Sequence, residues 1–249
     1  MRREAYDHDG MHVFLSLVIP AYNEERRIQA TLEVVESYLA QYGTICEIIA
    51  VNDGSTDSTL DILRECAARS RIVRVLDYSP NRGKGHAVRQ GMLAARGDFV
   101  AFSDADLSAP IEDLSKLFDE IDKGYDVAIG SRAMRESKLA KHQPRYRELG
   151  GRMLNRIVQI AAVPGIKDTQ CGFKLFTHEA SYEIFSRCFL NGWGFDIEVL
   201  YLARRLGYRI SEVPVVWAHA EDSKIHPFKA GLQILKDLVR IRLHNYRLP

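Results

Sequence analysis

Short apolar runs alternate with amphipathic segments through the first two thirds of the chain. The runs are rich in Val, Ile and Phe and occupy residues 14–20, 46–52, 72–78, 98–104 and 126–132. After the first run, apolar residues recur at the spacing of an amphipathic helix, at Ile28, Leu32, Val35 and Leu39. Helical segments also follow the second and third runs. Strands that are buried on both faces and joined by crossover helices predict an α/β fold with a mostly parallel, mixed sheet.

Each apolar run ends in a polar cluster: "PAYNEE", "NDGSTD", "SPNRGKG", "SDADLS" and "GSR". Ligands of such sheets bind beyond the carboxyl ends of the strands, so these clusters are expected to meet at one edge. From residue 133 to about 225 polar loops dominate, without a repeat or a linker. We therefore expect a short N-terminal extension (1–12), one α/β domain (13–225) and a C-terminal helix (226–249).

Composition and charge narrow the class of protein. The 249 residues are 46% hydrophobic, and 34 basic against 33 acidic residues give no support for nucleic-acid binding. Four widely spaced cysteines form no C-x-x-C pair, which is typical of reduced thiols in a cytoplasmic compartment and excludes a thiolate zinc site. The first residues do not have the pattern of a signal peptide, and no apolar stretch approaches ~18 residues, so we expect a soluble or peripheral protein.

Asp104-Ala105-Asp106 follows the fourth apolar run directly. On an extended chain, residues i and i+2 point to the same side, so both carboxylates can face one ligand. Hard oxygen ligands suit Mg²⁺ or Mn²⁺, which accept phosphate oxygens as further ligands. The alternative is a turn or a helix cap, which also uses Asp. The position after a buried strand, beside the other polar clusters, favours the metal.

The remaining clusters offer phosphate and base contacts. Asp53 of "NDGS" is either a turn residue or an acceptor for the imide N–H of a uracil. "NRGKG" lacks the spacing of a P-loop, although Lys84 and its neighbouring Arg82 could contact phosphate. Arg132 and Lys224 are candidate phosphate ligands if the fold brings them to the edge. Asp168 is a candidate general base or a cap.

Read in order, these motifs resemble a family 2 glycosyltransferase with the GT-A fold, and more narrowly the polyprenyl (dolichyl)-phosphate sugar synthases. The resemblance runs from "LSLVIPAYNEERRI" to "DSKIHPFKAGLQILKDLVRIR". It implies that the base and ribose of a nucleotide sugar are held by Pro20, Ala21, Tyr22, Glu24 and Asp53. It also implies that Ala105 lies beside the nucleotide and that Asp104 and Asp106 bind the metal on its diphosphate. Arg132 and Lys224 would face the donor phosphates or the acceptor phosphate.

The sequence departs from the mannose-type members of this family. Ser108, a weak ligand, stands where they often place Gln or Ser as a further metal neighbour, and Ala218 stands where they tend to have an arginine. Trp217, seven residues before Lys224, and "DTQCGFKLF" are similar to the glucose-type members. The resemblance therefore favours UDP-glucose over GDP-mannose as the donor.

The expected reaction is an inverting, metal-dependent transfer of glucose to a polyprenyl phosphate, with Asp106, Arg132, Asp168 and Lys224 as catalytic candidates. The acceptor phosphate is already anionic at neutral pH and can attack without a strong base, so a base role for Asp168 is not required. Transfer to a saccharide hydroxyl, which would make a base essential, is one alternative. A sugar-nucleotide-binding protein without turnover is another, although it could dispense with the paired carboxylates.

The C-terminal segment combines apolar and basic residues at helical spacing. Phe228, Leu232, Leu235, Val239 and Leu243 form the apolar stripe, interleaved with Lys229, Lys236, Arg240, Arg242 and Arg247. Such a helix can lie in the interface of an anionic membrane, which would place the protein at the cytoplasmic face. Docking on the protein core or in a homodimer is the alternative.

Overall fold

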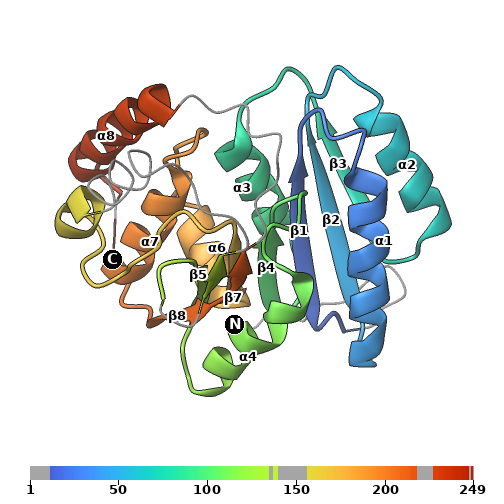
Figure 1. Cartoon of the computed structure of the whole chain (residues 1–249), viewed down its shortest axis with the longest axis horizontal. Coiled ribbons are helices and arrows are strands. Elements are labelled where there is room, and N and C mark those ends of the chain that lie inside the picture. The colour runs from blue at the N-terminus through green and yellow to red at the C-terminus, as the bar shows by residue number, and fades with distance from the viewer. Residues whose placement is uncertain (1–11, 135–136, 140–155, 218–226, 247, 249) are drawn as a thin grey trace.

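Seven strands form one mixed sheet in the computed structural model, which describes residues 12–134, 137–139, 156–217, 227–246 and 248 (Figure 1). In spatial order they are β3 (Val73–Tyr78), β2 (Cys46–Asp53), β1 (Leu15–Ala21), β4 (Phe99–Ser103), β7 (Phe173–Thr177), β5 (Val127–Ser131) and β8 (Ile210–Pro214). The pairs β4–β7 and β7–β5 are antiparallel, and the other pairs are parallel. The predicted α/β class with a mostly parallel, mixed sheet is confirmed.

Helices cover both faces of this sheet (Figure 1). One face carries α1 (Ile28–Leu39), α2 (Thr59–Arg69) and α4 (Leu114–Asp122). The other face carries α3 (Lys84–Ala94), α6 (His178–Phe185), α7 (Phe195–Arg205) and α8 (Pro227–Leu243). Two 3₁₀ turns, η1 (Ala40–Tyr42) and η2 (Ile111–Asp113), and a helical segment at 156–161 join these layers. A separate two-stranded ladder pairs β6 (Lys138–Leu139) with β9 (Val216–Trp217).

Alternation along the strands divides the core into two apolar clusters, one on each face. On β1, Leu17 and Ile19 belong to the cluster under α1, whereas Val18 between them belongs to the cluster under α3. The four apolar residues predicted for the inner face of α1 are all buried. Full burial of one such side chain contributes about 1.5–3 kcal/mol, so the two clusters hold the sheet and its helices together.

Helix α8 docks on the core through a face that differs from the predicted stripe. Ile234, Leu238 and Ile241 are buried in the same cluster as α7. Of the predicted stripe, Leu232, Val239 and Leu243 are exposed by 49%, 57% and 81%. The docked face is less regular in the sequence than the predicted stripe, because it contains Asp237, which is buried against Gly194 at the start of α7. Among the helices of the described residues, none has the length and apolarity needed to cross a bilayer.

The reversed strand β7 determines what meets at the carboxyl edge of the sheet. Strands β1, β2, β4 and β5 end there, whereas β7 begins there, with Phe173 opposite Ser103 in the ladder. The residues before β7 therefore arrive at the same edge as the residues after β4. This arrangement brings residues 168–172 next to the Asp104–Asp106 pair.

Candidate active site

The two aspartates after β4 lie in a turn. The strand ends at Ser103, and Leu107 N–H donates to Asp104 O over 3.1 Å. The expectation that the pair continues an extended strand is therefore wrong, because this turn closes directly after the strand. Asp106 Oδ1 accepts a hydrogen bond of 2.9 Å from Ser108 N–H, and Thr31 Oγ1 donates to Ala105 O over 2.6 Å. These contacts fix the turn and leave both carboxylates partly exposed at the edge.

Gly172 lies directly beneath the carboxylate of Asp104. Asp104 N–H donates to Gly172 O over 3.1 Å, so the turn after β4 is bonded to the residue before β7. A Cβ on Gly172 would lie 2.1 Å from Asp104 Oδ2, which no side chain can tolerate without displacing the carboxylate. Glycine at 172 therefore permits the observed position of Asp104.

Lys84, the first residue of α3, pairs with Asp104. Its Nζ lies 2.5 Å from Asp104 Oδ1, and the pair is only partly exposed. Burial lowers the pKa of Lys84, but the negative charges around it, Asp104 foremost, outweigh burial and raise that pKa above its ordinary value. The ammonium also lies 5.2 Å from the ring centroid of Trp193, a half-exposed residue in the loop before α7. Lys84 is thus held at the edge as a cation, as a phosphate ligand requires.

Arg132 and Asp168 form a two-pronged ion pair beside this turn. Arg132 Nε and Nη2 lie 2.7 and 2.8 Å from the two carboxylate oxygens, and Arg132 N–H donates to Oδ2 over 2.9 Å. Trp217 stacks on the guanidinium at 4.6 Å. Burial raises the pKa of Asp168, but the hydrogen bonds and charge of Arg132 outweigh burial and hold that pKa below its ordinary value. Asp168 is therefore an anion that orients Arg132, which is unfavourable for a general base.

Asp53 is engaged with the loop before α3. Its two oxygens accept hydrogen bonds from Tyr78 Oη, Asn81 Nδ2, Arg82 N–H and Gly83 N–H, at 2.8–2.9 Å. The side chain is 3% exposed. These contacts place Asp53 under the loop that presents Lys84. A direct contact between Asp53 and a nucleotide base stays a prediction.

The predicted "PAYNE" residues lie where β1 ends, at the same edge. Tyr22 is half-exposed, and Ala21 is buried. Glu24 N–H donates to Thr59 Oγ1 over 2.8 Å, and the Glu24 carboxylate pairs with Arg27 Nε at 2.8 Å. The loop that follows Pro20 is thereby bonded to the start of α2. Contacts of these residues with a base or ribose stay predictions.

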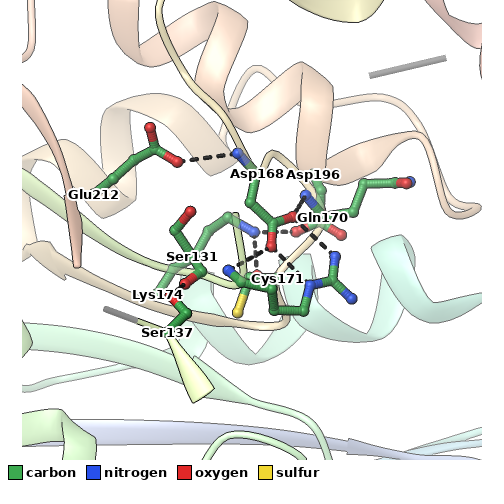
Figure 2. Close-up of polar contacts among 9 residues, drawn as sticks. Ser131, Ser137, Asp168, Gln170, Cys171, Lys174, Asp196 and Glu212 are labelled. Atoms are coloured by element: carbon green, nitrogen blue, oxygen red, sulfur yellow. Dashed lines mark hydrogen bonds and ion pairs between the residues drawn. The ribbon is translucent and has the colours of Figure 1, made fainter. Parts of the chain in front are cut away.

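Sequence reasoning missed a buried ion pair behind the Asp104 turn. Lys174, on β7, has no exposed surface and contacts the carboxylate of Asp196 in α7 (Figure 2). The signal was present in "CGFKLF", where one charged residue stands among apolar strand residues and needs a buried partner. Cys171, beside this pair, has a thiol pKa raised to about 12 by burial, so it is not a nucleophile at neutral pH.

Lys224 and Ala218 lie outside the described residues, so the predicted phosphate contact of Lys224 is not described. A surface cavity of about 480 Å³ lies near Pro164, Arg204 and Glu212, and none of the predicted site residues lines it.

Within the described part of the chain, no three His, Cys, Asp or Glu side chains gather as a metal site. A cation on Asp104 and Asp106 would complete its coordination with ligand oxygens and water.

Comparisons with known proteins identify the family. The sequence model of glycosyl transferase family 2 matches residues 16–185. A dolichyl-phosphate beta-glucosyltransferase from Saccharomyces cerevisiae is 40% identical over 253 aligned positions, covering 94% of this chain and 76% of that protein. The protein of the same description from Homo sapiens is 37% identical and covers 92% of this chain and 75% of that protein.

Solved structures support the fold. Glucosyl-3-phosphoglycerate synthase from Mycobacterium tuberculosis, in complex with UDP, superposes with a TM-score of 0.66 at 23% identity. The similarity covers 95% of this chain and 81% of that one. A complex of the same protein with Mn²⁺, UDP and phosphoglyceric acid has a TM-score of 0.65 at 22% identity. The strand order, the family match and the relatives together show that this chain belongs to glycosyltransferase family 2, has the GT-A fold and is a glycosyltransferase.

Proposed function

We propose that this protein transfers glucose from UDP-glucose to a polyprenyl phosphate of the dolichyl type, with inversion at the anomeric carbon. The proposal rests on the relatives, whose descriptions name a dolichyl-phosphate acceptor and a glucosyl group. The observation that carries it is the gathering of Lys84, Asp104, Arg132 and Asp168 at one edge of the sheet. Two cations beside a carboxylate turn suit a diphosphate donor and a phosphate acceptor.

Asp104 and Asp106 would hold Mg²⁺ or Mn²⁺. The donor set fits, because both are hard carboxylates, partly exposed, at an edge that phosphate oxygens can reach. A bound cation would neutralise negative charge on the departing UDP. Lys84 would exchange the carboxylate of Asp104 for a donor phosphate oxygen, since a cation at Asp104 repels the ammonium. Arg132, held by Asp168 and Trp217, would orient a phosphate oxygen with its remaining N–H donors.

The locked state of Asp168 supports an acceptor that needs no base. A phosphate monoester has its second pKa near ~6 and is largely a dianion at neutral pH. A sugar hydroxyl would have to lose a proton during attack, and Asp168 is bonded through both oxygens to Arg132. The contacts of Asp168 therefore favour the phosphate acceptor over a saccharide.

A donor and acceptor panel tests the proposal. We expect a glycolipid from UDP-glucose and polyprenyl phosphate with Mg²⁺ or Mn²⁺, and little product from GDP-mannose or with a saccharide acceptor. Asp106→Ala should abolish transfer. Asp168→Asn should retain measurable activity, and the dependence of its rate on pH should show no titration of a general base. Transfer only to a saccharide, or equal loss in both variants with folding intact, would refute this assignment.

We further propose that the exposed face of α8 binds an anionic membrane, which holds the protein at the cytoplasmic face. On this face Leu232, Val239 and Leu243 are flanked by basic residues, with Lys236 and Arg240 on one side and Arg242 on the other. Each basic residue near an anionic surface contributes about 1 kcal/mol. Ile157 and Ile160, in the helical segment at 156–161, are also exposed apolar residues. The four cysteines are buried and unpaired, as suits a reducing compartment.

Vesicle binding tests this face. Deleting α8 would uncover the core, so point variants are preferable. We expect wild-type protein to co-sediment with phosphatidylglycerol vesicles and Leu232→Ser/Val239→Ser/Leu243→Ser to stay in solution. Val34→Ser, at an exposed apolar position on α1, is the matched control. Equal co-sedimentation of all three proteins would refute membrane binding by α8, and a dimer that the triple variant dissociates would assign the face to a second copy.

A further inference from the structure

Lys174 and Asp196 make an ion pair in the interior of the protein, behind the edge of the sheet. Lys174 has no exposed surface, and Asp196 is 2% exposed. Burial raises the pKa of Asp196, against the opposing effects of the charges on Lys174 and Lys84. Such a pair contributes little net stability compared with apolar residues of the same size, because both ions lose their hydration. Stability is therefore a weak explanation for its presence.

The ammonium of Lys174 also holds the backbone beneath Asp104. Lys174 Nζ donates to Cys171 O over 2.6 Å (Figure 2). The next residue, Gly172, accepts the hydrogen bond of Asp104 N–H and lies against its carboxylate. One fixed ammonium thus determines the position of the short segment on which Asp104 rests.

The same ammonium also contacts the strand that leads to Asp104. Lys174 lies opposite Phe102 in the β4–β7 ladder, and its Nζ is 5.1 Å from the centroid of that ring. Asp196 anchors the ammonium from the first turn of α7. Lys174 therefore connects the end of β4, the start of β7 and the start of α7.

We infer that Lys174 and Asp196 are positioning residues that set the carboxylate of Asp104 for a divalent cation. The inference rests on the proposed metal site at Asp104 and Asp106. Without the ammonium, the carbonyl of Cys171 loses its donor and the 171–172 turn can shift, which moves the Asp104 carboxylate away from Asp106. Residues that orient metal ligands typically change metal affinity by 10–100-fold when they are removed.

Mn²⁺ affinity, measured by electron paramagnetic resonance in the presence of UDP, tests the inference separately from activity. Lys174→Met should bind Mn²⁺ at least about tenfold more weakly than wild type. Because that variant leaves Asp196 buried and unpaired, the double variant Lys174→Met/Asp196→Leu removes both charges at similar volume and is expected to fold. The double variant should also bind Mn²⁺ about tenfold more weakly, with UDP binding in the absence of metal unchanged.

Lys116→Met is the matched control, because Lys116 also pairs with an aspartate, Asp113, at 2.6 Å, and donates to Pro214 O. Its Mn²⁺ affinity should equal that of wild type. Wild-type affinity in the folded double variant would overturn the positioning role and leave the proposed function intact. Failure of wild-type protein itself to bind Mn²⁺ with UDP would overturn both the metal site and this inference.

Discussion

Gly172 shows how closely the backbone approaches a predicted metal ligand. A methyl group there would overlap the Asp104 carboxylate, whose Oδ2 would lie 2.1 Å from the new Cβ. We expect Gly172→Ala to remove most transferase activity, because the carboxylate must rotate or the turn must shift. Steady-state rates at saturating Mn²⁺ would measure this loss. Gly192→Ala is the control, since a Cβ at 192 meets no heavy atom within 4 Å and its rate should be unchanged.

The ion pair of Asp168 makes a prediction about stability and pH. Because Arg132 holds the pKa of Asp168 below its ordinary value, the pair stabilises the folded state above the unfolded pKa, near ~3.9. This contribution is lost as the pH falls through the lower folded pKa. Asp168→Asn should therefore lower the melting temperature at pH 7 more than at pH 3. A difference that is constant over this range would contradict the assigned direction of the shift.

Individual site residues were predictable where they follow strands. Asp104, Arg132 and Lys84 were singled out because polar residues after buried strands meet at one edge, and the structure brings them there. The partners of these residues were not predictable to the same degree. Lys174 and Asp196 meet only because β7 runs against its neighbours, and no local spacing in the sequence encodes that reversal.

At the scale of elements, α8 has two apolar faces with different environments. Ile241 is fully buried in the core, whereas Leu243 is 81% exposed. We expect Ile241→Ala to lower the free energy of unfolding by about 2–5 kcal/mol, and Leu243→Ala to change it by less than about 0.5 kcal/mol. Urea unfolding of both variants measures this. Similar losses in the two variants would mean that the helix does not dock as described.

Helix α8 also shows why a periodic pattern can mislead about burial. The predicted stripe has regular spacing, but the docked face has the buried Asp237 among Ile234, Leu238 and Ile241. That carboxylate accepts hydrogen bonds from Gln233 and Arg240 of its own helix and lies against Gly194, directly before α7. In α1 the predicted apolar positions are the buried ones, because the rest of the helix, apart from the exposed Val34, offers no second apolar stripe.

For the whole molecule, the site unites strands from both halves of the sheet, so ligands should stabilise the fold globally. Mn²⁺ with UDP at 100 times their dissociation constant would add about 2.7 kcal/mol if they bind only the folded state. We expect UDP alone to raise the melting temperature of wild-type protein and Mn²⁺ with UDP to raise it further. Asp106→Ala should lose the part of the rise that depends on Mn²⁺. An identical rise in that variant would place the metal elsewhere.

The reversed strand β7 has a consequence for how this architecture can vary. Because β7 is hydrogen-bonded on both sides, the spacing between the first four strands and the last two is fixed by two ladders. Lengthening or shortening the connections above the sheet leaves that framework intact. The sheet beneath the site is thus held in one arrangement. New substrate preferences can therefore arise by changes in the loops at its carboxyl edge.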